Sequence, residues 1–166
     1  MYPQSHLLFP LFIGELLVKL SIVDQRFVLV AVLVGVFIDI DHLFKHLYLT
    51  GEFSIRKTWN AGIVKHEQDR TFLHHIPAIM TMTVIFAVLC IYYPYWTLAV
   101  ALGYYSHMLL DHISLRRGFV DYITTKESWG LWKPVKIKIF GLQMRLAKHE
   151  IVFDILLIVG LIILIF

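Results

Sequence analysis

The chain has 166 residues, enough for one domain, and 58% of them are hydrophobic whereas only 16% are charged. A typical soluble domain is about 45–50% apolar and about 25% charged, so this composition argues against a soluble domain and indicates an integral membrane protein. The net charge of +3 decides little by itself, and the single cysteine, Cys90, excludes an internal disulfide and a cysteine-based zinc site.

Five apolar segments are predicted as helices, and residues 1–166 are expected to form a single membrane-embedded domain. A helix needs about 20 residues, with a range of about 17–25, to cross a bilayer. The second to fourth segments fit this range, the first contains two charged residues, and the last is short but mostly aliphatic. In chain order the segments are Leu7–Val23, Phe27–Leu49, Phe72–Tyr93, Trp96–Ile113 and Ile151–Phe166. The sequence therefore predicts an all-α integral membrane bundle of about five helices.

Two short and two long links join these segments. Residues 24–25 form a tight polar link, and Pro94 lies in a short aromatic turn, a composition that favours the membrane interface. The long links, Thr50–Thr71 and Ser114–Lys148, are polar and basic. Within the second, residues 135–139 alternate apolar and basic side chains, which predicts a small β-hairpin.

The basic residues are divided unequally between the two ends of the predicted bundle. The long links and their flanks hold 13 of the 15 Lys and Arg residues. Because basic loops favour the cytoplasmic side of a membrane, the long links are predicted to be cytoplasmic. Five crossings then place the N-terminus inside and the C-terminus outside.

Nearly every histidine and carboxylate that could bind a metal lies at the same end of an apolar segment. Because successive crossings alternate in direction, these groups are predicted to meet at the cytoplasmic face. Ionisable groups at membrane depth are costly and usually functional, and a His/Asp cluster is typical of a metal site. The candidates are His6, Asp39, Asp41, His42, Asp69, His74, His107, Asp111 and Glu150.

The strongest local signal is His107 followed by Asp111, because a spacing of four places both side chains on one helical face. An imidazole and a carboxylate together suit zinc, manganese or iron. The alternative is a buried, hydrogen-bonded His–Asp pair that holds helices together.

Asp39, Asp41 and His42 end the second segment. Residues 39 and 41 cannot share a face of a regular helix, so either the helix unwinds here or only part of the set binds a metal. Acidic residues at a helix C-terminus oppose the helix dipole, and a bound cation would compensate for this. The alternative is a solvated helix end.

The remaining candidates begin segments. Asp69 at a helix start is typical of capping, whereas Arg70 lies one turn before His74 and has a planar side chain that suits a phosphate oxygen. His6 near a terminus is a weak signal, and Glu150 in a first helical turn is also explained by the helix dipole.

Four blocks in this order resemble the YdjM-type family of membrane-bound, metal-dependent hydrolases, and a weaker match involves Trp132, Pro134 and Glu150. The four are Ser5-His6-Leu-Leu-Phe, Ile38-Asp39-Ile-Asp41-His42, Asp69-Arg70-Thr-Phe-Leu-His74 and Gly103-Tyr-Tyr-Ser106-His107-Met-Leu-Leu-Asp111. The chain departs from the family pattern where Ile38 replaces Pro and Asp69 replaces His. The family is distantly similar to the all-α zinc-dependent phospholipase C and nuclease superfamily, so the resemblance implies phosphoester hydrolysis.

These observations predict a membrane-embedded, metal-dependent hydrolase that cleaves a phosphoester of a lipid or lipid-linked substrate at the cytoplasmic face. The expected cofactor is a divalent metal, zinc first, with manganese or magnesium as alternatives. Asp39 or Asp69 is predicted as general base, and Arg70 is predicted to hold developing negative charge. The ligands of first choice are His6, Asp41, His74, His107 and Asp111, with Asp39, His42, Asp69 and Glu150 binding a second ion or orienting the first set.

A non-enzymatic membrane protein with a structural or sensory His/Asp metal site is the alternative. The predicted partners are membrane lipids, because the basic second long link suits anionic headgroups. Nucleic acid is not an expected partner.

Overall fold

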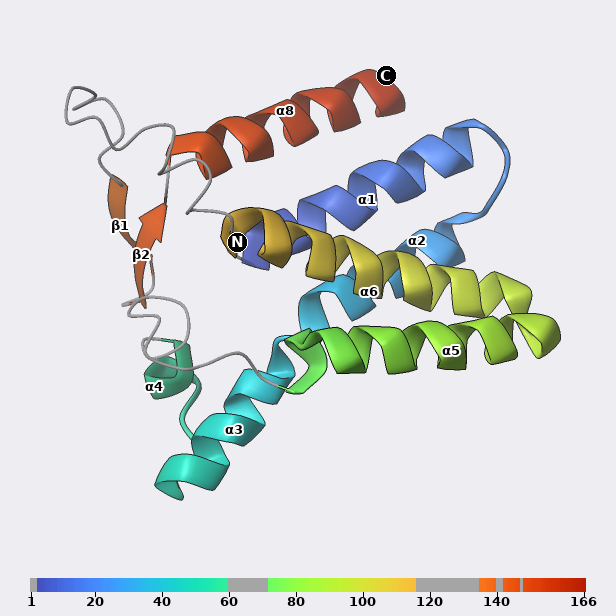
Figure 1. Ribbon diagram of the computed structural model, residues 1–166. Helices are drawn as coiled ribbons and strands as arrows, with labels where there is room; N and C mark the ends of the chain where they lie inside the picture. The colour runs from blue at the N-terminus through green and yellow to red at the C-terminus, as the bar shows by residue number, and fades with distance from the viewer. Residues whose placement is uncertain (1–2, 60–71, 116–134, 140–141, 147) are drawn as a thin grey trace, which may run out of the picture.

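A computed structural model of the protein describes residues 3–59, 72–115, 135–139, 142–146 and 148–166 (Figure 1). The described residues are mainly helical, as the composition and apolar segments predict. The helices are α1 (Pro3–Lys19), α2 (Gln25–Phe37), α3 (Ile40–Thr50), α4 (Ile55–Trp59), the 3-10 helix η2 (Phe72–His74), α5 (Ile76–Tyr92), α6 (Pro94–Leu115) and α8 (Lys148–Ile165).

A pair of short strands lies in the second long link. Strand β1 (Val135–Ile139) pairs antiparallel with β2 (Leu142–Leu146), so that Val135 is opposite Leu146 and Ile139 is opposite Leu142. The alternation of apolar and basic residues thus forms the hairpin that it predicts.

The second apolar segment is divided into α2 and α3, whereas one continuous helix is predicted there. The backbone N–H groups of Asp41 and His42 bond to carbonyls only three residues earlier, which tightens the chain into a 3-10 turn at residues 38–39. Helix α3 then extends away from the other helices (Figure 1). The acidic residues at this point therefore lie at a break in the helix rather than at its end.

Among the described residues, Gln25–Thr50, taken as one stretch, is long and apolar enough to cross a membrane. Ile76–Tyr92 is a shorter apolar helix. The five-crossing topology thus stays a prediction for the remaining segments.

Helices α1 and α8 lie side by side and run in the same direction (Figure 1). Near their starts, the Ser5 hydroxyl donates a hydrogen bond of 2.7 Å to Asp154 Oδ1. Near their ends, Lys19 Nζ donates one of 2.8 Å to the Leu164 carbonyl. With α2, α5 and α6 alternating between them, both long links begin and end at the same side of the bundle.

Small residues allow α2 and α6 to pack backbone against backbone. Ala31 and Ala99 are fully buried, and a Cβ atom added to Gly103 would lie only 2.3 Å from the Ala31 carbonyl oxygen and 3.0 Å from the Gly35 nitrogen. Small residues are typical of helix interfaces in membranes, where they permit close approach. This contact lies one helical turn from His107 and therefore sets the position of that side chain.

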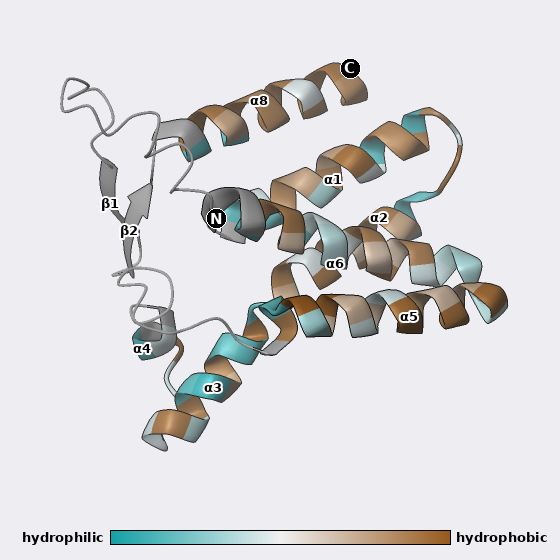
Figure 2. Cartoon of the chain, in the orientation of Figure 1, coloured by the Kyte–Doolittle hydropathy of each residue, from teal (hydrophilic) through white to brown (hydrophobic). Residues whose placement is uncertain are grey.

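Helices α5 and α8 consist mostly of hydrophobic residues (Figure 2), and both expose large apolar side chains. A helix that exposes large apolar side chains all along one face requires an apolar environment around it. On α5 these exposed side chains are Ile76, Met80, Val84, Val88 and Ile91.

Asp24 connects the two short links, which meet at the end of the bundle opposite the long links. Its carboxylate caps α2 by accepting hydrogen bonds from the N–H groups of Arg26 and Phe27, at 2.9 and 3.2 Å, and it also accepts one from the Tyr95 hydroxyl. The Tyr95 hydrogen bond and the two backbone hydrogen bonds hold the pKa of Asp24 below its ordinary value of 3.8.

Asp24 should therefore contribute a pH-dependent part of the stability. Because its pKa is lowered by folding, the contribution is complete above pH 3.8 and is lost as the pH falls through the native pKa. We expect Asp24→Ser, which keeps a capping oxygen, to unfold at a lower temperature than wild type at pH 7. Thermal unfolding in detergent at pH 7 and below pH 3.8 measures this, and an equal difference at both pH values would contradict it.

Candidate metal centre

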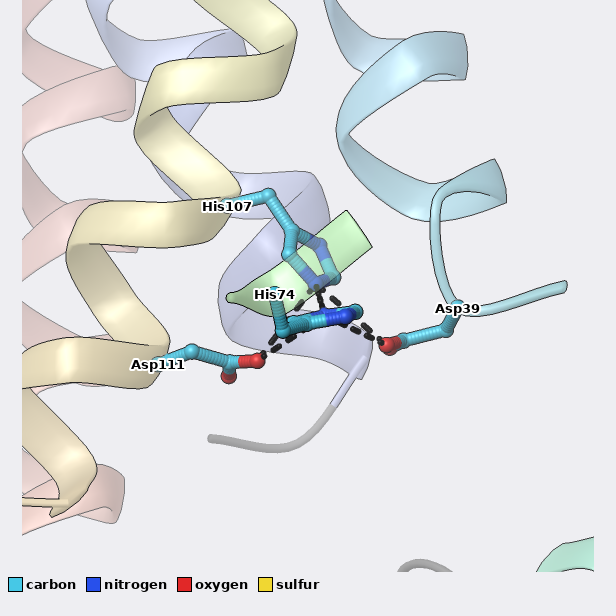
Figure 3. A group of neighbouring side chains, drawn as sticks. All are labelled: Asp39, His74, His107 and Asp111. Atoms are coloured by element: carbon cyan, nitrogen blue, oxygen red, sulfur yellow. Dashed lines mark hydrogen bonds and ion pairs between the residues drawn. The ribbon is translucent and has the colours of Figure 1, made fainter. Parts of the chain in front are cut away.

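Four side chains from three separate parts of the chain converge where the long links join the helices (Figure 3). Asp39 comes from the break between α2 and α3, and His74 from the end of η2. His107 and Asp111 lie one turn apart on α6, as their spacing predicts. Each residue offers one ligand atom, and these four atoms all lie within 4.8 Å of one another.

The distances between these atoms can be compared with those of a tetrahedral metal site. His74 Nε2 lies 3.1 Å from His107 Nε2 and 3.3 Å from Asp111 Oδ2. Asp39 Oδ1 lies 3.3 Å from His107 Nε2 and 3.8 Å from His74 Nε2. Bonds of about 2.0–2.2 Å to zinc place neighbouring tetrahedral ligand atoms about 3.3–3.6 Å apart. The four distances, from 3.1 to 3.8 Å, lie near this range, so the four side chains could hold a metal ion.

The tautomer of neutral His107 is fixed by the backbone of α2. Its Nδ1 lies 2.7 Å from the carbonyl oxygen of Gly35, and because a carbonyl only accepts hydrogen bonds, Nδ1 carries the proton. The Nε2 lone pair then points into the cluster. Histidines that bind metals almost always donate their other N–H in this way, so His107 is prepared as a ligand.

His6 supports the cluster from α1 and is not one of the four grouped residues. Its ring stacks on that of His107 with centroids 3.9 Å apart, and its Nε2 lies 3.2 Å from Asp111 Oδ1. Asp111 thus contacts His6 with one oxygen and presents the other to His74. This geometry gives His6 an orienting position, whereas the sequence placed it among the ligands of first choice.

A second group joins the first through His74. Asp41, His42 and His74 each offer one ligand atom, and these three atoms also lie within 4.8 Å of one another. Asp39 and Asp41 both contact His74, at 3.8 and 3.5 Å, across the 3-10 turn at residues 38–39. The sequence allowed either a local change of helix geometry or the use of only part of this set, and both explanations stay open, because Asp39 belongs to one group and Asp41 and His42 to the other.

The sequence also predicts Glu150, Asp69 and Arg70 as site residues. Glu150 lies in the first turn of α8 and is 1% exposed, yet it belongs to neither grouped set. Asp69 and Arg70 lie outside the described residues. Sequence reasoning did not identify the Gly35 carbonyl or the packing of Gly103, although Gly103 lies in the same block as His107.

A family model described as YdjM inner membrane protein matches residues 1–165. The chain belongs to this family. The resemblance expected from the four blocks is thus confirmed, and the family name describes an inner membrane protein. No curated protein and no solved structure matches the chain. This YdjM family protein therefore combines a membrane setting with a buried His/Asp cluster that could hold a metal ion.

Proposed function

We propose that the protein is a membrane-embedded, metal-dependent hydrolase that cleaves a phosphoester of a lipid or lipid-linked substrate at the cytoplasmic face. The observation that supports this proposal is the convergence of Asp39, His74, His107 and Asp111, whose ligand atoms all lie within 4.8 Å of one another. Zinc is the first choice, because imidazole and carboxylate ligands in this geometry suit it. When bound, such a metal supplies an activated water and polarises a phosphoryl oxygen.

The protein's own side chains would orient the ligands, transfer a proton and stabilise negative charge. His107 is held by the Gly35 carbonyl, and Asp111 is held by His6, so both keep their orientation when a substrate enters. Asp39 and Asp111 are 26% and 21% exposed, whereas His107 is fully buried, so the carboxylate side is the open one. Because Asp39 Oδ1 lies among the ligand atoms, we assign proton transfer to Asp69 and charge stabilisation to Arg70.

The apolar surface beside the cluster supports a lipid substrate. Helix α3, which carries Asp41 and His42 in its first turn, leaves Phe44 and Tyr48 62% and 89% exposed. These two residues lie one turn apart on the same face of α3. A surface of this kind next to the cluster suits acyl chains, and membranes supply them at high concentration.

Substitution of Phe44 should slow hydrolysis of lipid substrates without slowing hydrolysis of soluble ones. Burial of a phenylalanine side chain contributes about 1.5–3 kcal/mol, so we expect Phe44→Asp to slow hydrolysis of phospholipid in vesicles by about tenfold. Hydrolysis of a short-chain soluble phosphoester should be unchanged. Tyr92→Asp changes a similarly exposed residue at the opposite end of α5 and serves as control. Equal losses on both substrates would contradict a lipid-binding role for Phe44.

The decisive experiment is a screen of phospholipids and phosphoesters with protein purified in detergent. We expect turnover that a chelator abolishes and added Zn²⁺ restores, and that Asp154→Asn retains, since Asp154 bonds to Ser5 outside the cluster. Turnover that survives complete metal removal would exclude this mechanism.

The presence of four grouped side chains favours one alternative, a structural or sensory metal site. Structural zinc sites have four protein ligands, whereas catalytic sites keep an open position. A metal held by all four residues would join the α2–α3 break, η2 and α6 and would fix or report the folded state. Stoichiometric metal without turnover of any substrate would favour this structural or sensory function.

A further inference from the structure

His74 faces two different groups through its two ring nitrogens. On one side, Nε2 lies 3.1 Å from His107 Nε2 and 3.3 Å from Asp111 Oδ2. On the other side, Nδ1 lies 3.5 Å from Asp41 Oδ2. A single imidazole ring therefore lies between the group described above and the first turn of α3.

The first turn of α3 contains polar atoms that are buried without hydrogen bonds. Both carboxylate oxygens of Asp41 and Nδ1 of His42 have no hydrogen-bond partner within normal distance among the residues that the structure describes. Asp41 Oδ2 makes a long ion pair of 3.5 Å with His74 Nδ1, and the other nitrogen of His42, Nε2, lies 3.9 Å from Asp39 Oδ1. Buried polar atoms are almost always hydrogen-bonded, and exceptions need an explanation such as an ion. Two imidazoles and a carboxylate are the ligands that a transition metal prefers.

The break in the second apolar segment gives this arrangement a physical reason. In a continuous helix, Asp39 and Asp41 would point about 200° apart, and one histidine could not contact both. The 3-10 turn at residues 38–39 brings Asp39 to the Nε2 side of His74, at 3.8 Å, and Asp41 to its Nδ1 side. The turn therefore allows one histidine ring to contact both carboxylates, one at each nitrogen.

We propose that Asp41, His42 and Nδ1 of His74 form a second cation position, and that the His74 ring bridges it to the first. This inference rests on the metal site of the proposed function. A ring bound at both nitrogens has released its N–H proton. Since two bonds of about 2.0–2.1 Å and the ring itself separate them, the ions lie more than about 4 Å apart. They are thus further apart than the about 3.5–4 Å of ion pairs that clamp one reacting group.

Metal stoichiometry tests the second position. The full chain is purified in detergent, equilibrated with Zn²⁺, freed of excess metal and measured by elemental analysis. We expect two zinc ions per chain in wild type and one in both His42→Ala and Asp41→Asn. His75→Ala is the matched control, because His75 is exposed beside His74 and belongs to neither group, and this variant should keep two ions.

Electron paramagnetic resonance of the Cu²⁺-loaded protein tests the bridge. Two Cu²⁺ ions joined by one imidazole ring are coupled, so wild type should give a much weaker signal per copper than His42→Ala, which holds an isolated ion. One zinc ion per wild-type chain, two ions in both variants, or independent copper signals would each overturn the inference. The proposed hydrolase would survive any of these results, and two coupled ions without turnover would retain the inference while removing the enzyme.

Discussion

Replacement of Asp111 by Asn should remove the metal and abolish hydrolysis. Asp111 Oδ2 lies 3.3 Å from His74 Nε2 and 3.6 Å from His107 Nε2, and Oδ1 lies 3.2 Å from His6. Asn keeps the shape but loses the negative charge and one oxygen. Because changing a residue behind a ligand already costs about 10–100-fold in metal affinity, loss of a ligand charge should cost more than about 100-fold.

The measurement is a zinc titration of the purified variant, with elemental analysis before and after dialysis. Asp154→Asn provides the matched control, because Asp154 is a carboxylate on α8 that bonds to Ser5 and belongs to neither group. This variant should keep the wild-type affinity. An Asp111→Asn protein that binds zinc as tightly as wild type would show that the four residues do not form a metal site.

The convergence of the cluster could be predicted from sequence because it depends only on the order of the segments. Apolar stretches of crossing length alternate in direction, so His74 and His107, at the start of one segment and near the end of the next, return to the same end. The His107–Asp111 spacing likewise needs only helical periodicity. Both features follow from segment order and local spacing, so they can be predicted without knowing how the helices pack.

The membership of each group could not be predicted, because it depends on tertiary contacts and side-chain rotation. Asp39, expected as general base or as ligand of a second ion, lies among the four grouped residues, whereas His6, expected as a ligand, contacts Asp111 and stacks on His107. Apolar periodicity does not reveal the 3-10 turn at residues 38–39 that places Asp39 there. Nor does any spacing indicate which nitrogen of His74 faces Asp41.

Because the site depends on helix packing, we expect substitution of Gly103 to have a large effect on stability and on zinc binding. A Cβ atom there would lie 2.3 Å from the Ala31 carbonyl oxygen and 2.8 Å from the Val34 Cβ, and backbone cannot move aside as a flexible side chain can. We expect Gly103→Ala to destabilise the protein by about 3 kcal/mol, the upper end of the usual range for overpacking. The shift would also separate His107 from the Gly35 carbonyl and weaken zinc binding by about 10–100-fold.

Gly160→Ala distinguishes this effect from the general cost of adding a methyl group to a packed helix. A Cβ atom at Gly160 would meet the Phe12 ring, 2.6 Å from Cε2, and the outer edge of a ring can turn away. We therefore expect a much smaller loss of thermal stability and unchanged zinc affinity in this variant. Equal losses in the two variants would show that the close approach of α2 and α6 does not position His107. A Gly103→Ala protein that is less stable but binds zinc normally would show that the cluster tolerates displacement of α6.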